Sequence, residues 1–576
     1  MPSVDFLFAF SCYFITKGGG CIEKYLEPAN KESGGSGRRA SVLRLTKPRL
    51  PLFFSVLLFF CQFILHFLHF MIYFYAINTY YSTNFYKENA MEPRNLTLLT
   101  DLYELTMMQG YFHEKDANEM VIFDAFYRNN PDGNGFSICA GLEQVIEYIK
   151  NLHFEKEDVD YLRSTGLFTE DFLDYLRNFK FTGDIYAIPE GTVIFPREPL
   201  IKVIAPIMQA QLVETAILNI VNHQSLIATK TSRIIHAARG DGIMEFGLRR
   251  AQGPDAGIYG ARAAMIAGCI GTSNVLAGQM FDVPVKGTHA HSWIMSFPDE
   301  LTAFRTYAKL YPSACILLVD TYDTLNSGVP NAIRVFTEMR EAGIPLKGYG
   351  IRLDSGDLAY LSKKAKAMLD AAGFTDAIIS ASNDLDEYLI DSLKMQGATI
   401  NSWGVGTNLI TSKDCPSFGG VYKLAAIRDR DTGKFIPKIK LSENTEKVTN
   451  PGNKTIYRIY GKNDGKIIAD LICLADEVYD ENKSLLLFDP IETWKKTHLA
   501  PGTYTMRELL VPVFQSGECV YHSPKVMEIR DYCQRELNTL WDESRRLINP
   551  HEVHVDLSNE LWHMKNQLLD SYHYND

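Results

Sequence analysis

The chain has 576 residues, of which 46% are hydrophobic and 22% charged, and its formal net charge is -11. A single hydrophobic core stops growing at about 250–300 residues, so this length predicts more than one domain. The acidic balance argues against a protein that coats nucleic acid, although a locally basic pocket can still bind an anion. The ten cysteines are scattered without a CxxC pair, which argues against a disulfide scaffold or structural zinc and favours a reducing compartment.

The first 90 residues differ from the rest. Residues 52–77 contain no Asp, Glu, Lys or Arg and are long enough to span a bilayer. Five basic residues between positions 38 and 49 precede this stretch and would keep the N-terminus cytoplasmic. Two interpretations stay open: residues 52–77 anchor the protein to a membrane, or the working protein starts at Met91 and lies in the cytosol. We favour the second.

Residues 91–228 predict an N-terminal α/β domain. Helical periodicity runs over 98–112, a strand pattern over 121–127 and a second helix over 141–152. The β-branched residues and prolines of 191–206 are typical of short antiparallel strands.

Residues 229–428 alternate short apolar runs with amphipathic stretches, which predicts parallel strands joined by crossover helices. Either an open doubly wound sheet or a barrel would fit this alternation. Polar residues close each predicted strand, and a barrel would gather them at one mouth, so we expect an irregular α/β barrel. These residues are Asp320, Arg352 with Asp354, Ser382 with Asn383, and Thr407. Residues 429–576 are expected to form a C-terminal module that packs back on the earlier part.

Two features of this region suit a phosphate group. The loop over 404–423 carries Gly404, Gly406, Gly419 and Gly420 together with the hydroxyl of Thr407, although the glycines could equally serve a tight turn. Arg249 and Arg250 follow an apolar strand and precede a Gly-Pro turn, a placement suited to bidentate phosphate binding. Lys230 and Arg233 could add positive charge or simply flank the core.

Two further segments carry titratable groups. In 286–293, His289 and His291 would point the same way in an extended chain, but no third metal ligand stands nearby, and a histidine can also accept a phosphoryl group. In 352–357, Arg352 could bind a carboxylate, while Asp354 and Asp357 could hold Mg²⁺ through water or sugar hydroxyls. Asp357 could instead cap the following helix. The chain has no GxxxxGK[ST] motif for ATP.

Seven segments in order resemble the nicotinate phosphoribosyltransferase family, and the resemblance runs from about Met91 to near the C-terminus. They are LLTDLYELTMMQGY (98–111), FDAFYRNNP (123–131), EFGLRRAQGPD (245–255), GTHAHSW (287–293), RLDSGDL (352–358), GVGTNLITS (404–412) and FGGVYKL (418–424). The first 90 residues have no counterpart in the family. The stretch between His291 and Arg352 is short beside some members.

The resemblance implies a fold and an activity. It implies an N-terminal α/β region, an irregular α/β barrel of the type II phosphoribosyltransferase kind and a C-terminal region, in a homodimer with sites near the subunit interface. The reaction would join nicotinate to 5-phosphoribosyl-1-diphosphate with coupled ATP hydrolysis and Mg²⁺ (or Mn²⁺), feeding NAD synthesis. Rival hypotheses are a related transferase that uses nicotinamide or quinolinate, and a membrane-anchored, non-catalytic binding protein.

Matching motifs carry the family's site residues to positions in this chain. His291 resembles the phosphorylated histidine, Tyr103 and Thr288 resemble nicotinate contacts, and Arg352 resembles the partner of its carboxylate. Thr407 resembles a contact of the 5-phosphate. The remaining residues expected to line the donor site are Arg128, Arg249, Arg250, Gly406, Gly419 and Gly420. Asp354 is our candidate for the carboxylate that stabilises an oxocarbenium-like ribosyl carbon, and nucleic acid is not expected as a partner.

Overall fold

The computed structural model describes residues 94–116, 118–443 and 447–573. Residues 52–77, with the membrane-anchor hypothesis attached to them, lie outside the described residues. Among the helices that the structure does describe, none combines the length and apolar character required to cross a membrane.

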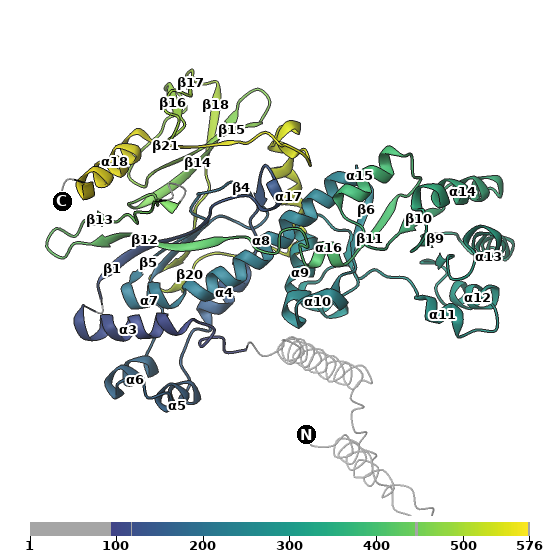
Figure 1. Cartoon of the computed structure of the whole chain (residues 1–576), viewed down its shortest axis with the longest axis horizontal. Helices are drawn as coiled ribbons and strands as arrows, with labels where there is room; N and C mark the ends of the chain where they lie inside the picture. Colours follow the sequence, from purple (N-terminus) through teal and green to yellow (C-terminus); the bar gives the residue numbers. More distant parts are fainter. Residues whose placement is uncertain (1–93, 117, 444–446, 574–576) are drawn as a thin grey trace, which may run out of the picture. The chain divides into compact units, whose positions relative to one another are not determined.

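A seven-stranded antiparallel sheet organises the N-terminal part (Figure 1). Its order is β13-β12-β1-β5-β3-β19-β20, so late segments of the chain complete a sheet that early segments begin. The strands are β1 (Met120–Tyr127), β3 (Asp184–Ala187), β5 (Ile201–Pro206), β12 (Gly420–Arg428), β13 (Phe435–Pro437), β19 (Val511–Gln515) and β20 (Glu518–Cys519). A short pair, β2 (Ser137–Ile138) and β4 (Val193–Ile194), stands apart from it.

Helices cover this sheet and share one apolar core with it. The rings of Phe123 in β1 and Tyr422 in β12 stack with centroids 4.7 Å apart, which joins two strands that are far apart in the sequence. The helices are α3 (Leu102–Glu114), α4 (Leu142–Lys150), α5 (Lys156–Ser164), α6 (Glu170–Arg177), α7 (Ile207–Leu212) and α8 (Glu214–Ala237). The helices predicted over 98–112 and 141–152 correspond to α3 and α4. The boundary proposed at residue 228 stays a prediction; α8 runs through it without a break.

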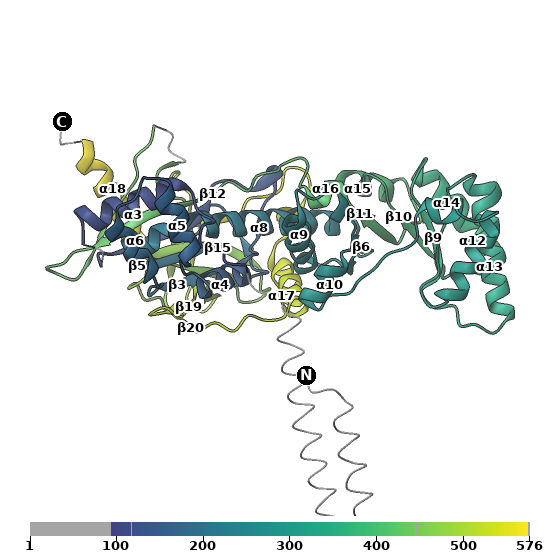
Figure 2. The same ribbon diagram turned by 90° about the horizontal axis from the view of Figure 1, so that it is seen from below.

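Six parallel strands form the second sheet, in the order β7-β6-β11-β10-β9-β8. They are β6 (Gly242–Glu245), β7 (Gly271–Thr272), β8 (Ile316–Leu318), β9 (Gly350–Leu353), β10 (Ile378–Ala381) and β11 (Ser402–Val405). Figures 1 and 2 show β6 and β11 close together, followed by β10 and then β9. The connecting helices are α9 (Pro254–Ala267), α10 (Val275–Phe281), α11 (His291–Met295), α12 (Glu300–Leu310), α13 (Val329–Glu341), α14 (Leu358–Ala371), α15 (Glu387–Met395) and α16 (Thr407–Ile410).

One extended segment links the two edges of this sheet. Val285 pairs with Thr272 of β7 in a parallel bridge, and four residues later the His289 ring accepts a hydrogen bond from the Leu318 amide of β8 at 3.3 Å. β7 and β8 do not pair with each other, and the segment 285–289 spans the gap between them, which gives the irregular α/β barrel that the sequence predicts.

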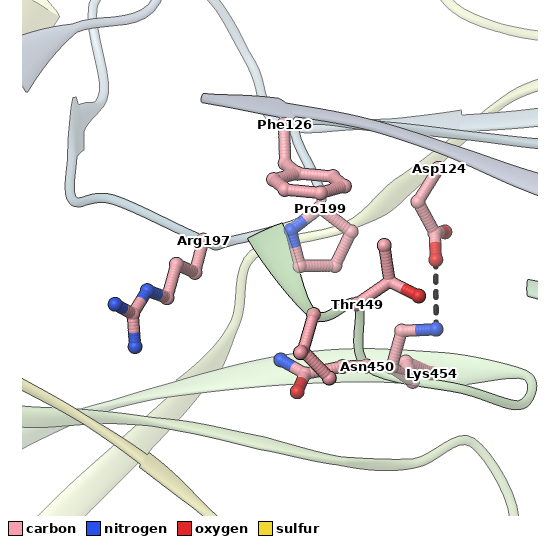
Figure 3. Close-up of a pocket in the computed structure, with 8 residues that line it drawn as sticks. Asp124, Phe126, Arg197, Pro199, Thr449, Asn450 and Lys454 are labelled. Atoms are coloured by element: carbon pink, nitrogen blue, oxygen red, sulfur yellow. Dashed lines mark ion pairs between the residues drawn. The ribbon is translucent and has the colours of Figure 1, made fainter. Parts of the chain in front are cut away.

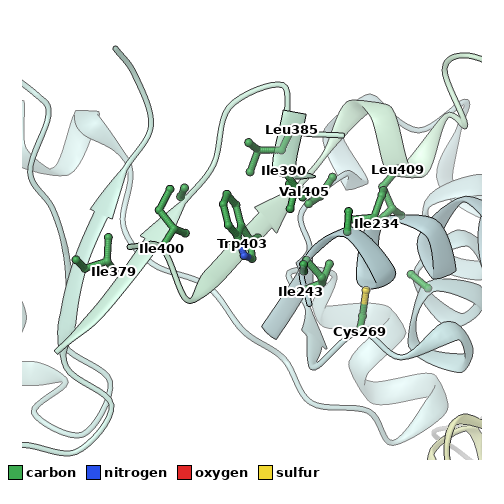
Figure 4. Packing of buried hydrophobic residues seen from close by; sticks show 14 of the residues in the cluster. Ile234, Ile243, Cys269, Ile379, Leu385, Ile390, Ile400, Trp403, Val405 and Leu409 are labelled. Atoms are coloured by element: carbon green, nitrogen blue, oxygen red, sulfur yellow. The ribbon is translucent and has the colours of Figure 1, made fainter. Parts of the chain in front are cut away.

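The barrel strands are buried on both faces, as expected for a parallel sheet covered by helices. Trp403 of β11 is fully buried among aliphatic side chains, including Ile234 of α8 and Ile390 of α15 (Figure 4). Its indole nitrogen donates to Asp241 Oδ2 at 2.9 Å, which satisfies the one polar atom of the ring.

The C-terminal part contributes a four-stranded sheet of order β18-β14-β15-β21 and the pair β16-β17. A fully buried Arg458 in β14 holds Asp470 of β15 at 2.6 Å and Glu536 of the helix α17 at 3.3 Å. Because α17 also contacts α9, this part packs back on the barrel. The elements are β14 (Lys454–Gly461), β15 (Ile467–Leu474), β16 (Leu485–Phe488), β17 (Lys496–Leu499), β18 (Tyr504–Glu508), α17 (Val526–Thr539), β21 (His554–Leu557) and α18 (Asn559–His573).

Candidate active site

The carboxyl ends of the parallel strands meet at one edge, so the polar residues that follow them gather at the barrel mouth. Asp320 and Thr321 follow β8, Asp354 follows β9, and Ser382 follows β10. Gly406 follows β11, and Arg249 and Arg250 follow β6.

Arg352, the third residue of β9, is the most connected side chain of this mouth. Its guanidinium donates through Nε to Ser382 Oγ at 3.0 Å, through Nη1 to the Thr288 hydroxyl and the His289 carbonyl, and through Nη2 to Asp354 Oδ1 at 3.3 Å. Two of the expected nicotinate contacts, Arg352 and Thr288, are therefore in direct contact. With 16% of its side-chain surface exposed, this cation sits at the boundary between protein and solvent.

His291 opens α11 and lies between two polar partners. Its Nδ1 is 3.1 Å from the Thr321 hydroxyl, and its Nε2 is 3.5 Å from Asp354 Oδ2. The ring is held from both sides while 38% of the side chain remains exposed to an incoming reactant. Thr321 was not predicted, although it directly follows Asp320 at a strand end, which is the signal that identified its neighbours.

His289 behaves differently from His291. It is 8% exposed, its Nε2 accepts from the Leu318 amide, and its ring centroid lies 4.6 Å from that of Tyr307. Burial lowers the pKa of His289 to about 4, and the neighbouring Arg352 and His291 act in the same direction. His289 is a neutral, structural residue. The two histidines do not share one face, because the helix that begins at His291 ends the extended alternation.

Two carboxylates stand side by side at the mouth. Asp320 Oδ2 accepts from the Asp354 amide and the Ser355 hydroxyl, each at 2.7 Å, and Asp354 Oδ1 accepts from Ser382. Asp320 Oδ1 is buried without a hydrogen-bond partner. Asp357 lies apart from this pair, because it caps α14 by accepting from the Tyr360 amide at 3.0 Å. Of the two roles considered for Asp357 from the sequence, the structure shows the helix cap.

Asp320 and Asp354 suit Mg²⁺ only when a substrate supplies further oxygen ligands. Over 94–116, 118–443 and 447–573, no group of three or more His, Cys, Asp or Glu side chains is arranged to hold a metal ion. Mg²⁺ commonly binds through one or two carboxylates together with substrate phosphates. Asp320, with its free buried oxygen, and Asp354 could supply such a site together with the phosphates of a substrate.

The glycines of the predicted phosphate loop divide into two groups. A Cβ on Gly404 would overlap the Phe246 ring, and Gly406, with φ -111° and ψ -102°, precedes α16, which begins at Thr407. Gly420 instead opens β12 in the antiparallel sheet, where a Cβ would overlap the Asn222 side chain, and Gly419 directly precedes it with a φ of +70°. Close packing, the alternative weighed from sequence, explains Gly404 and Gly420.

The four cations that the sequence offered for phosphate binding differ in burial and in ion pairing. Arg249 and Arg250 are exposed on a 3₁₀ turn (Leu248–Arg250), and neither has an ion-pair partner among the described residues. Lys230 and Arg233 are buried against carboxylates, so their charge is already compensated.

Tyr103 and Arg128 belong to the N-terminal part. Tyr103 lies on α3 and is 47% exposed; burial and a hydrogen bond to Glu104 raise its pKa. Both views place α3 at the opposite end of the described part from β9 (Figures 1 and 2). Arg128 and Lys440 each lie near Lys423: burial lowers the pKa of Lys423, and the charges of these two cations lower it further. Of these three cations, only Arg128 is expected at the site from the sequence; Lys423 lies within the FGGVYKL segment but was not singled out.

A pocket lies between β1 and the segment 448–454 (Figure 3). An ion pair between Asp124 and Lys454 of 2.7 Å closes one side of it, and Arg197 lies at the other. None of its lining residues belongs to the candidate site.

Comparison with known proteins identifies one family along the chain. The nicotinate phosphoribosyltransferase N-terminal domain matches residues 98–222, the family's central region matches 242–428, and its C-terminal domain matches 453–565. A nicotinate phosphoribosyltransferase of Bacillus subtilis is 46% identical over 482 residues, which span 84% of this chain and 97% of the relative. A human one is 32% identical over 528 residues, covering 82% and 96%.

Solved structures agree. The crystal structure of human nicotinic acid phosphoribosyltransferase superposes with a TM-score of 0.70 at 31% identity, covering 82% of this chain and 100% of that one. A nicotinate-nucleotide pyrophosphorylase from Pyrococcus furiosus superposes with a TM-score of 0.58 at 22% identity, covering 77% and 96%, and shows likeness of fold alone.

Proposed function

Since the chain belongs to the nicotinate phosphoribosyltransferase family, we propose that it joins nicotinate to 5-phosphoribosyl-1-diphosphate, forming nicotinate mononucleotide and diphosphate. This reaction is the first step of NAD synthesis from nicotinate. The observation that carries the proposal is the contact of Arg352, Thr288, Asp354 and His291 at one barrel mouth.

Arg352 and Thr288 are proposed to bind the nicotinate carboxylate. A guanidinium fixed by surrounding hydrogen bonds presents its charge without further reorganisation. A neutral amide in the same position would make weaker hydrogen bonds to this cation than a carboxylate does, which is how the site would prefer the acid over nicotinamide.

The sugar donor is proposed to lie across the neighbouring strand ends. The Thr407 hydroxyl and the backbone near Gly406 would hold the 5-phosphate, and Arg249 and Arg250 would face the diphosphate. As the bond from the ribosyl carbon to diphosphate breaks and the ring nitrogen bonds to that carbon, Asp354 would stabilise the oxocarbenium character. Asp320 and Asp354 would hold Mg²⁺ (or Mn²⁺), which supplies charge neutralisation for the leaving diphosphate.

His291 is proposed to couple ATP to turnover. One imidazole nitrogen would take the γ-phosphoryl group, forming a P–N bond as ADP leaves, and water would later release phosphate. Thr321 and Asp354 would fix the ring for both steps.

The active form is proposed to be a cytosolic homodimer. Two apolar surfaces are exposed on a single chain: α3 presents Leu102 and Met107 beside Tyr103, and α10 presents Val275 and Leu276. Burying such surfaces would favour a second copy. Tyr103 would then reach the mouth of its partner, which accounts for its distance from Arg352 in one chain.

The decisive test measures nicotinate mononucleotide formation with and without ATP, for the chain and for His291→Asn. We expect product from nicotinate but not from nicotinamide or quinolinate. His291→Asn should retain slow ATP-independent synthesis and lose its stimulation by ATP. Turnover of the amide or of quinolinate instead would reject the proposed substrate, and unchanged stimulation in the variant would reject the phosphohistidine.

A further inference from the structure

A buried charge cluster lies behind the barrel mouth and is centred on Lys230 of α8. Lys230 Nζ donates to Glu387 Oε1 at 3.0 Å and to Asp414 Oδ2 at 2.8 Å, and Arg233 Nε donates to the same Glu387 oxygen at 2.8 Å. Both cations are 3% exposed. The Asp132 carboxylate lies 3.7 Å from Lys230 Nζ and completes the cluster.

The carboxylates of this cluster come from separate loops. Glu387 is the first residue of α15, directly after the exit of β10, and Asp414 follows α16 in the loop that leaves β11. A second contact joins the same two exits, because Asn408 Nδ2 donates to the Asp384 carbonyl at 2.9 Å. Lys230 therefore ties the two neighbouring strand ends to one rigid helix.

We infer that Lys230 is a positioning residue for the donor-binding loop: by holding Asp414 against the β10 exit, it fixes Gly406 and Thr407 for the phosphate of the sugar donor. This inference rests on the proposed function. Lys230 itself is not a ligand, because three carboxylates surround the two buried cations and would repel an anion.

Replacing Lys230 should disturb mainly the loop that carries Asp414, because the rest of the cluster keeps its partners. A buried charge left without a partner is costly, but Arg233 would still compensate Glu387. Asp414 is half-exposed, so water can solvate its freed carboxylate while the loop over 412–417 loosens. The proposed nicotinate contacts would remain in place, because Thr288 lies on the 285–289 segment and Arg352 lies on β9.

The experiment uses the full chain with Lys230→Met, Asp414→Asn, the double variant and Lys394→Met. The last variant is the matched control, because Lys394 forms a partly buried pair with Asp241, at 2.7 Å, at the opposite end of the barrel strands. The readouts are amide hydrogen exchange over 406–418 and the KM values for donor and nicotinate.

We expect Lys230→Met and Asp414→Asn each to raise the KM for the donor about tenfold, with the KM for nicotinate within about twofold. The double variant should be no worse than either single one, since both remove the same contact. Exchange over 406–418 should quicken in all three variants and stay unchanged in Lys394→Met.

Equal rises in both KM values, additive effects or unaltered exchange would each overturn the positioning role. If Lys230→Met does not fold, the half-exposed Asp414→Asn decides alone. If the wild-type chain shows no turnover, the proposed function fails, whereas hydrogen exchange still tests whether Lys230 holds the loop.

Discussion

At the scale of single residues, the hydrogen bonds around Arg352 explain how a surface-facing cation acquires a fixed geometry. Four donor contacts to Ser382, Thr288, His289 and Asp354 restrain the guanidinium. The family resemblance assigned Arg352 and Thr288 separately to nicotinate, and the structure brings the two side chains into contact. It did not predict Thr321, because a hydroxyl at a strand end has no spacing rule that ties it to a histidine 30 positions earlier.

Replacing Arg352 should affect one substrate far more than the other. We expect Arg352→Ala to lower kcat/KM for nicotinate by about 100-fold or more, because the carboxylate loses its charged partner. The KM for the sugar donor should change by no more than about twofold. Steady-state kinetics with each substrate varied will measure both values.

Arg340→Ala is the matched control for this variant. Arg340 is exposed on α13, where its guanidinium stacks on Phe374 at 4.5 Å, and it has no place in the mouth. A parallel loss of affinity for both substrates in Arg352→Ala would contradict its assignment to the nicotinate carboxylate.

At the scale of elements, two glycines allow the ends of β6 and β11 to approach closely. A Cβ on Gly404 would overlap the Phe246 ring, and a Cβ on Gly247 would overlap Ile410 of α16. The sequence suggested that such glycines admit a ligand or serve close packing. The structure shows that Gly404 packs against protein, while Gly406 and Thr407 lie where β11 ends and α16 begins.

Gly404→Ala should therefore destabilise the barrel. Overpacking at a filled position costs about 1–3 kcal/mol, so the free energy of unfolding should fall by that amount in urea denaturation followed by circular dichroism. The double variant with Phe246→Leu should recover part of the loss, because the smaller side chain makes room for the added methyl group.

Gly110→Ala provides the comparison. Gly110 lies within α3 and no atom lies within 4 Å of the Cβ it lacks, so alanine should raise helix stability by about 1 kcal/mol. If Gly404→Ala were as stable as the wild type and Phe246→Leu had no compensating effect, the packing explanation would be wrong.

At the scale of the whole molecule, the expected site residues occupy two regions of one chain. Thr288, His291, Arg352 and Asp354 meet at the barrel mouth, while Tyr103 and Arg128 lie with the antiparallel sheet. The proposed homodimer brings the two regions together across an interface, so each site would need residues from both copies.

Mixing two inactive variants tests this arrangement. Tyr103→Ala and Arg352→Ala should each be nearly inactive alone. After joint unfolding and refolding, half of the dimers should contain both chains, with one intact site of two, which restores about a quarter of wild-type activity. Product formation and the mass of the particle in solution are the measurements.

A second mixture supplies the control. His291→Asn and Arg352→Ala change residues of the same mouth, so no combination of these chains contains an intact site. Equal recovery in both mixtures, or a monomeric active protein, would rule out a site shared between copies.

The sequence by itself determined the α/β class, the expected barrel and which polar residues follow its strands. These conclusions need only local information, because hydrophobic periodicity and a polar residue after a buried strand are local properties. Only the tertiary structure decided which strand ends are neighbours, since the order β7-β6-β11-β10-β9-β8 arises from packing between distant segments. That packing placed Thr321 beside His291 and buried Lys230 among carboxylates. It also assigned Gly420 to the antiparallel sheet, where it pairs with Tyr127 of β1, although Gly420 is close in sequence to Gly406.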